Sequence, residues 1–207
     1  MTRTYRMKLR AERQADTRRR IVEAAVHLHR TIGPDRTTIS DIARLAGVER
    51  PTVVRHFSDR LSLFMACSFH GMQQDPLPDA AFWAEIDDPE ARLLRALLEQ
   101  YAYYRRNRVL ESHTRDLVEA DDELAPLREA MRQRDVYVRA VLADGWSVPD
   151  EARGRLLMAI GHALNFWAWF SLAELGLGDD EAAGLMVEMV RGVLAGPKLS
   201  SAPRRKR

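Results

Sequence analysis

Apolar residues recur at steps of three and four along most of this chain, which is the period of an amphipathic α-helix. The pattern predicts about nine helices, and residues 82–87 are expected to be a loop or a short turn. No stretch shows the strict alternation of apolar and polar residues that marks a half-buried strand. The sequence therefore predicts an all-α protein, with helices over about 18–31, 38–46, 51–57, 58–73, 89–108, 109–120, 121–145, 150–176 and 180–195.

The stretch from Thr38 to Phe57 predicts two short helices joined by a tight turn. Thr38 and Asp41 have the spacing of a capping box at the start of the first helix. Gly47 falls at the turn, where glycine adopts a left-handed backbone at low cost. Pro51 suits the first turn of the second helix, because its missing N–H had no partner there. This combination is typical of a helix-turn-helix, whose second helix lies in the major groove of DNA.

The polar residues of this stretch are left on its outer side. Arginine can pair with a guanine edge, and threonine can bond a phosphate or touch a thymine methyl group. The alternative is a helical hairpin with a solvated charged face. We expect base contacts from Arg50 and Thr52. The full predicted DNA-binding set is Thr38, Ser40, Arg44, Arg50, Pro51, Thr52, Arg55, His56 and Arg60.

Residues 18–64 resemble the DNA-binding domain of the tetracycline-repressor (TetR-like) family. The match runs in register through three helices, over Arg20, Ile21, Ala24, Ala25, Gly33, Thr37, Thr38, Ile42, Ala43, Ala46, Gly47, Val48, Thr52, His56 and Phe57. The resemblance implies a homodimer that binds a palindromic double-stranded DNA operator, and a variable helical C-terminal domain that binds a small-molecule effector. Val54 stands where the family usually has a phosphate-contacting tyrosine, so that contact is in doubt. Arg60 replaces the usual lysine and keeps its charge.

Charge is sorted along the chain, although the whole chain has a net charge of only +2. Residues 1–60 carry 14 Lys and Arg against 7 Asp and Glu, whereas residues 61–196 carry 13 against 23. Residues 197–207 carry 5 basic residues and no acidic ones. A basic end joined to an acidic body indicates a DNA-binding head on a body that does not bind DNA.

These observations predict four parts. Residues 1–17 are expected to be a basic flexible arm that either enters the minor groove or only aids solubility. Residues 18–64 form the helix-turn-helix domain, residues 65–196 a helical ligand-binding and dimerisation domain, and residues 197–207 a basic tail. The resemblance implies that the two C-terminal helices form the dimer interface as half of a four-helix bundle.

Residues 156–173 carry no formal charge, at the lower length limit of a membrane span. Gly161, His162, Asn165 and Ser171 would be costly in lipid, and no second span follows. A buried or dimer-forming helix is therefore favoured over a membrane segment. The N-terminus has no apolar signal core, and the single Cys67 rules out an internal disulfide, so a cytoplasmic location is expected.

The sequence offers no sign of catalysis. None of the six histidines has partners at metal-ligand spacing, and neither a phosphate-binding loop nor a nucleophile elbow is present. Cys67 lies in an apolar helical run and is expected to be an inert core residue. We therefore expect no enzyme, no metal and no cofactor.

The body does contain aromatic residues with polar tips, as effector sites do. The alternative is plain core or dimer packing, which is the commoner fate of aromatic residues at helical spacing. The candidate pocket residues are Tyr101, Tyr104, His113, His162, Phe166 and Trp169, with Trp167 beside them. Such a pocket would suit a medium-sized, partly apolar ligand.

Taken together, the sequence predicts a DNA-binding transcriptional regulator, more often a repressor, that an effector releases from its operator. Two alternatives stay open. One is a DNA-compacting architectural protein without an operator, and the other is a helical enzyme or binding protein.

Overall fold

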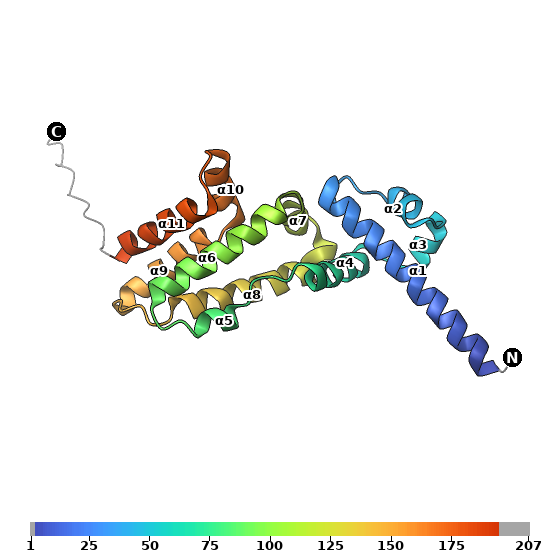
Figure 1. Ribbon diagram of the computed structural model, residues 1–207, viewed down its shortest axis with the longest axis horizontal. Helices are drawn as coiled ribbons and strands as arrows, with labels where there is room; N and C mark the ends of the chain where they lie inside the picture. Colours follow the sequence, from blue (N-terminus) through green and yellow to red (C-terminus); the bar gives the residue numbers. More distant parts are fainter. Residues whose placement is uncertain (1–2, 195–207) are drawn as a thin grey trace, which may run out of the picture. The chain divides into compact units, whose positions relative to one another are not determined.

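The structure is a computed structural model that describes residues 3–194. Over this range it is entirely helical, with eleven α-helices, one short 3-10 helix and no strand (Figure 1). Two compact units share these helices. The N-terminal unit holds residues up to Leu77 and Tyr104–Gln133, and the C-terminal unit holds Pro78–Tyr103 and the chain from Arg134 onward.

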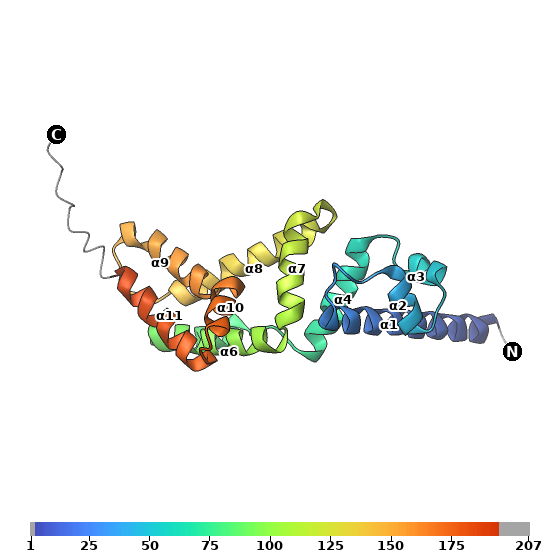
Figure 2. The same ribbon diagram turned by 90° about the horizontal axis from the view of Figure 1, so that it is seen from above.

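In the N-terminal unit, α1 (Arg3–Thr31) is the common support. It packs against α2 (Ile39–Ala46), α4 (Arg60–Gln74) and α7 (Arg108–Ala120), while α3 (Arg50–His56) packs on α2 (Figure 2). Their shared core is built from apolar residues that sequence periodicity places on the inner faces. It contains Ile21, Val22, Ala24, Ala25, Val26, Ile42, Ala43, Ala46, Val53, Phe57, Leu63 and Cys67.

A smaller core joins α4 and α7 to the 3-10 helix η1 (Asp122–Leu124), just before α8 (Ala125–Ala143). It consists of the buried side chains of Phe64, Val118 and Leu124. Asp75, at the end of α4, accepts hydrogen bonds from Arg106 and Asn107, which lie just before α7. Because α4 and α7 pack on α1, this unit is larger than the expected domain of residues 18–64.

The C-terminal unit contains α5 (Ala80–Ala84), most of α6 (Pro89–Arg106), the end of α8, and α9 to α11. Helices α9 (Asp150–Ala163) and α11 (Asp179–Leu194) lie side by side, and α10 (Phe166–Glu174) packs on both (Figures 1 and 2). Its interior includes the fully buried side chains of Trp83, Leu93, Leu97, Tyr101, Leu142, Leu156, Ile160, Phe166 and Trp169.

The expectation of a flexible arm over residues 1–17 is wrong for the described part of it. Helix α1 begins at Arg3 and runs without a break to Thr31. The residues between them are mainly good helix formers, such as Arg, Lys, Leu, Met, Ala, Glu and Gln, and no proline or glycine interrupts them. The expected basic tail lies outside the described residues.

The expectation of one helix over residues 150–176 is also wrong. The helix breaks at Asn165, whose side chain accepts hydrogen bonds from the backbone N–H groups of Trp167 and Ala168 and so caps a new helix. The two resulting helices are bent by 53°. In addition, α5 includes residues 82–84 of the expected loop or short turn, and the Asp59 side chain caps α4.

Candidate nucleic-acid interface

The predicted capping box at the start of α2 is confirmed. The Thr38 side chain accepts a hydrogen bond from the Asp41 backbone N–H, and the Asp41 carboxylate accepts one from the Thr38 backbone N–H. Hydrogen bonds from Thr38 lower the pKa of the Asp41 carboxyl, which keeps that carboxyl ionised. The start of α2 is therefore fixed by its own sequence.

The turn between α2 and α3 is also as predicted. Gly47 has φ 64° and ψ 42°, which is left-handed backbone, and its N–H bonds back to the last turn of α2. Val48 N–H donates to the Ala43 carbonyl at 3.0 Å and closes the turn. Pro51 lies in the first turn of α3, as expected.

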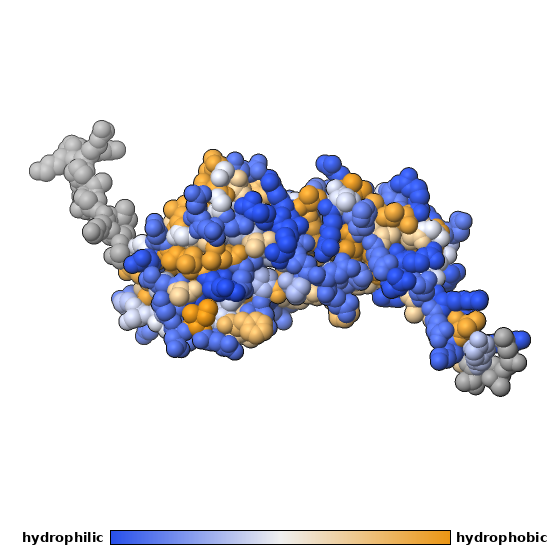
Figure 3. Space-filling model, viewed as in Figure 1, coloured by the Kyte–Doolittle hydropathy of each residue, from blue (hydrophilic) through white to orange (hydrophobic). Residues whose placement is uncertain are grey.

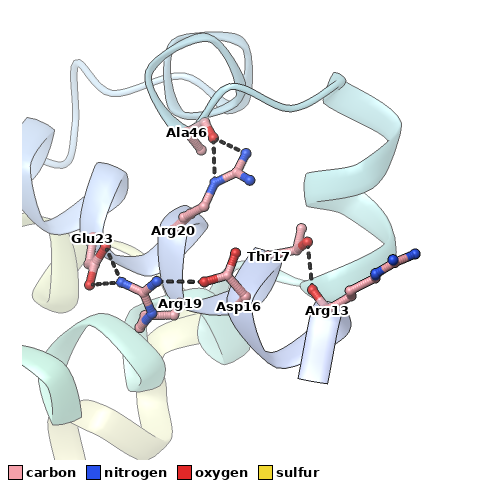
Figure 4. Close-up of polar contacts among 7 residues, drawn as sticks. All are labelled: Arg13, Asp16, Thr17, Arg19, Arg20, Glu23 and Ala46. Carbon is pink, nitrogen blue, oxygen red and sulfur yellow. Dashed lines mark hydrogen bonds and ion pairs between the residues drawn. The ribbon is translucent and has the colours of Figure 1, made fainter. Parts of the chain in front are cut away.

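Arg20 of α1 holds this turn from the other side. Its guanidinium donates two hydrogen bonds to the Ala46 carbonyl, at 3.1 and 2.6 Å (Figure 4). It donates another to the Gly47 carbonyl at 3.0 Å. These carbonyls end α2, where no backbone N–H within the helix remains to pair them. The sequence marked Arg20 only as a match to the first helix, because a contact across 26 residues leaves no local signal.

Helix α3 is further fixed by burial on one side. Val53 is fully buried and Phe57 is nearly so, while the Arg18 guanidinium lies over the Phe57 ring at 4.6 Å from its centre. The opposite side of α3 is open to solvent. It carries the exposed residues Arg50, Pro51, Val54 and Arg55, with Thr52 and His56 half-buried at its margins.

Two of these cations are free to meet a ligand. In the described part of the chain, the Arg50 and Arg55 side chains have no hydrogen-bond or ion-pair partner, and both residues are exposed. Burial, together with the positive charges of Arg55 and Arg18, lowers the pKa of His56. His56 is therefore neutral at neutral pH and offers a hydrogen bond rather than a charge.

The other predicted DNA-binding residues are less open. Arg44 is exposed but pairs with Asp41 at 2.7 Å, and the Thr38 hydroxyl is bonded to the same carboxylate. Ser40 is exposed on α2. Arg60 pairs with Asp121 at 2.7 Å and so links α4 to η1. In the structure Arg60 therefore makes an ion pair within the N-terminal unit, whereas the sequence predicted that it binds DNA.

A groove runs beside the turn. It is bordered by two residues of α1, by the end of α2 and by the start of α3, namely Thr17, Arg20, Ala43, Arg44, Gly47, Val48, Glu49 and Thr52. The groove therefore joins α1 to the exposed side of α3. Within its lining, Glu49 is the one acidic residue.

The candidate effector residues do not form one group. Tyr101, Phe166 and Trp169 lie together in the buried interior of the C-terminal unit, with ring centres 6.4 Å apart for Tyr101 and Trp169 and 5.6 Å for Phe166 and Trp169. The Tyr101 hydroxyl donates to the Ala163 carbonyl at 2.7 Å. His162 is exposed. The geometry of the three aromatic residues is that of core packing.

Tyr104 and His113 belong to the N-terminal unit. The Arg115 guanidinium lies over the Tyr104 ring, 5.5 Å from its centre. His113 Nδ1 is 2.8 Å from Asp35 Oδ1, so α7 touches the loop between α1 and α2. Gly33 in that loop has φ 89°, and a Cβ atom there would lie 2.8 Å from the His113 ring.

Comparisons with known proteins agree with this geometry. The family model for bacterial regulatory proteins of the tetR family matches residues 21–67, which span the helix-turn-helix and its supporting helices. Residues 21–67 therefore form a DNA-binding domain of the TetR type. The chain is a DNA-binding transcriptional regulator, as the sequence predicted.

Two curated relatives extend the match. The HTH-type transcriptional repressor BepR of Brucella suis is 28% identical over 172 residues, which are 74% of this chain and 81% of that protein. The HTH-type transcriptional regulator TtgR of Pseudomonas putida is 34% identical over 110 residues, about half of each chain. A TetR-like regulator from Rhodococcus sp. RHA1 has the same fold, with a TM-score of 0.62 and 17% identity over 87% of this chain and 97% of its own.

Three further observations concern the cysteine, metal-binding side chains and membrane spans. Cys67 is buried, and burial raises the pKa of its thiol to about 12, so the thiol stays protonated. Among residues 3–194, no group of His, Cys, Asp and Glu side chains could hold a metal ion. In the same range no single helix is long and apolar enough to cross a membrane, although the bent pair α9 and α10 passes that test by length and composition.

Proposed function

We propose that this protein is a homodimeric repressor that binds a palindromic operator and leaves it when a small effector binds. The observation that carries the proposal is the open cationic side of α3. Arg50 and Arg55 project from a short helix whose entry, turn and buried side are all fixed by other contacts. Such pre-organisation suits recognition of a rigid groove.

The roles within the interface follow from exposure and existing contacts. We assign base readout to Arg50 and Thr52, because they lie in the first turn of α3, the part that meets base edges in this motif. Arg55, His56, Ser40 and Arg44 are assigned to phosphates and sugars. Thr38 and Arg60 support the interface, since Thr38 caps α2 and Arg60 links α4 to Asp121 at the start of η1.

The dimer would form through α9 and α11. On α11 the exposed residues Leu185, Met189 and Gly192 follow each other at steps of four and three, so they lie on one face. Met158 on the adjacent helix α9 is 67% exposed. Figure 3 shows hydrophobic residues gathered over the part of the molecule that holds these helices. The same face also carries the exposed Glu188, but its apolar side chains are best covered by a second copy of the same face.

The effector would act through the helices that support α1. Both α4 and α7 pack on α1, and α7 also reaches the loop before α2 through His113 and Asp35. An effector that moves α4 or α7 therefore changes the support of the DNA-binding helices. Release requires only that the effector bind the released form more tightly than the DNA-bound form.

Of the predicted pocket residues, Tyr101, Phe166 and Trp169 lie together in the C-terminal unit, so an effector site there would require this packed aromatic group to open. The protein acts in this proposal by binding and not by catalysis. Its site of action is the chromosome, so we place it in the cytoplasm.

Replacing Arg50 by alanine tests the assigned readout. We expect Arg50→Ala to weaken binding to the operator by about 1–3 kcal/mol and to relax one base position, because a bidentate base contact is lost. Binding to random DNA should change little. The measurement is fluorescence anisotropy with operator and random duplexes, and the exposed Arg132→Ala on α8 serves as a charge-matched control.

The comparison between the two duplexes separates the candidate functions. A loss confined to the operator supports a sequence-specific regulator. An equal loss on both duplexes contradicts base readout by Arg50 and favours the architectural alternative. If the protein shows no salt-dependent binding to either duplex, the result favours the other alternative, a helical enzyme or binding protein.

A further inference from the structure

The first turns of α1 carry a row of arginines that the helix-turn-helix does not use. Arg6, Arg10 and Arg13 follow each other at steps of four and three, so they lie on one face of the helix. All three residues are exposed. In the range that the structure describes, their side chains have no ion-pair or hydrogen-bond partner. We call these three residues the α1 stripe.

The ion pairs within α1 do not involve the α1 stripe. Asp16 is only three residues from Arg13, but Asp16 and Glu23 both pair with Arg19, and the Glu23 carboxylate lies 2.9 Å from that guanidinium. The third acidic residue of this stretch, Glu12, falls outside the steps of four and three that the α1 stripe follows. Figure 4 shows the Arg13 side chain extending away from this group. The charge of Arg19 is thus balanced within α1, whereas the charges of the α1 stripe are not.

The same face of α1 leads into the interface already described. Thr17 and Arg20 continue the steps of four and three, and both line the groove beside the turn together with Thr52 of α3. Arg20 bonds the turn itself (Figure 4). The series from Arg6 to Arg20 rises about 20 Å along the helix, so it extends the interface beyond the reach of α2 and α3.

We propose that the α1 stripe binds the phosphate backbone of DNA beside the half-site that α3 occupies. This inference rests on the proposed function. Successive residues of the α1 stripe are about 5 Å apart along the helix axis, and duplex DNA carries one negative charge per about 1.7 Å of its own axis. A rigid helical row of unpaired cations suits such a polyanion, and because it reads no base edges it adds affinity without sequence preference.

The test uses charge-removing variants that keep the helix. Glutamine has a helix propensity close to that of arginine, so Arg6→Gln/Arg10→Gln/Arg13→Gln should leave α1 intact. The matched control is Lys8→Gln, because Lys8 lies on the same turns but well outside the face of the α1 stripe. Arg10→Gln and Lys8→Gln each remove one positive charge, so these two single variants are compared directly. Far-ultraviolet circular dichroism confirms that each variant keeps its helix content.

Binding is measured by fluorescence anisotropy on a labelled mixed-sequence duplex about three helical turns long, over a range of salt concentrations. The triple variant should reduce the steepness of log K against log salt by about 2–3 and weaken binding at least tenfold near physiological salt. Arg10→Gln should reduce the slope by about 1, and Lys8→Gln should leave it unchanged.

The outcomes distinguish this inference from the proposed function. If the wild-type protein binds DNA with a steep salt dependence and the triple variant does the same, the α1 stripe does not contact DNA and the inference is overturned. Equal effects of Arg10→Gln and Lys8→Gln would show a general charge effect and would overturn it too. If the wild-type protein does not bind DNA at all, the proposed function itself fails.

Discussion

Replacing Arg92 by methionine should destabilise the C-terminal unit by about 3 kcal/mol. Arg92 is buried in α6, and its guanidinium donates to the carbonyls of Ile86, Val141 and Asp144 at 2.8, 3.1 and 2.9 Å. It thereby ties the loop before α6 to the C-terminal end of α8. Methionine fills a similar volume but donates no hydrogen bond, so these carbonyls lose their partner.

Tryptophan fluorescence during urea unfolding measures this effect, because all four tryptophans lie in the C-terminal unit. The matched control is Arg95→Met, one turn along the same helix, where the arginine is exposed and pairs with Glu99. That change should cost no more than about 0.5 kcal/mol. Equal stability of the two variants would contradict the role given to Arg92.

The second large effect is a loss of stability in mild acid that depends on His29. Burial, together with the nearby positive charge of Arg60, lowers the pKa of His29 to about 4, and its ring stacks on Phe64 with the ring centres 5.4 Å apart. Above pH 6.5 the imidazole is neutral in both the folded and the unfolded chain. Below pH 6.5 only the unfolded chain takes up the proton, so the free energy of unfolding falls. The fall ends near pH 4 and totals about 3 kcal/mol.

His29→Leu removes the contribution of the imidazole to this pH dependence. The difference in the free energy of unfolding between the variant and the wild type should therefore change by about 3 kcal/mol between pH 7 and pH 4. Other groups with lowered pKa values, such as Asp59 and Asp75, also lose stability in acid but are common to both proteins. Urea unfolding followed by circular dichroism gives the free energies. His27→Gln is the control, because His27 is exposed on the same helix. A pH-independent difference between His29→Leu and the wild type would contradict the prediction.

Much of the helix-turn-helix could be predicted because its signals are local. Thr38 and Asp41 are three residues apart and form the capping box, and Gly47 is left-handed where the turn needs it. The exposed side of α3 also follows from periodicity, since Val53 and Phe57 fix the buried side. These features need no knowledge of the rest of the chain.

The features that were missed depend on distant residues or on competing local signals. The contact of Arg20 with the turn joins residues 26 apart, and nothing near Arg20 indicates it. The break at Asn165 was obscured by an uncharged apolar run, in which a capping side chain outweighed the continuous hydrophobic pattern. The pocket prediction combined residues from two units, because aromatic residues at helical spacing indicate burial but not which cavity they would face.

Within the candidate interface, the structure distinguishes residues that hold the two helices in place from residues that are open to solvent. Arg20, Arg18 and Thr38 hold the two helices in place, whereas Arg50 and Arg55 remain open. Mutations in the first group should therefore affect DNA binding through the shape of the unit, and mutations in the second group through lost contacts. The Arg50→Ala comparison described above depends on this distinction.

The most direct test of the central claim is selection of bound duplexes from a random DNA pool, at near-physiological salt and with protein free of bound small molecules. We expect enrichment of a palindrome whose half-site centres lie about one helical turn apart, because two copies of α3 would occupy adjacent major grooves on one face of the duplex. Binding without an enriched sequence would contradict a specific operator, and the absence of any binding would contradict the assignment as a DNA-binding regulator.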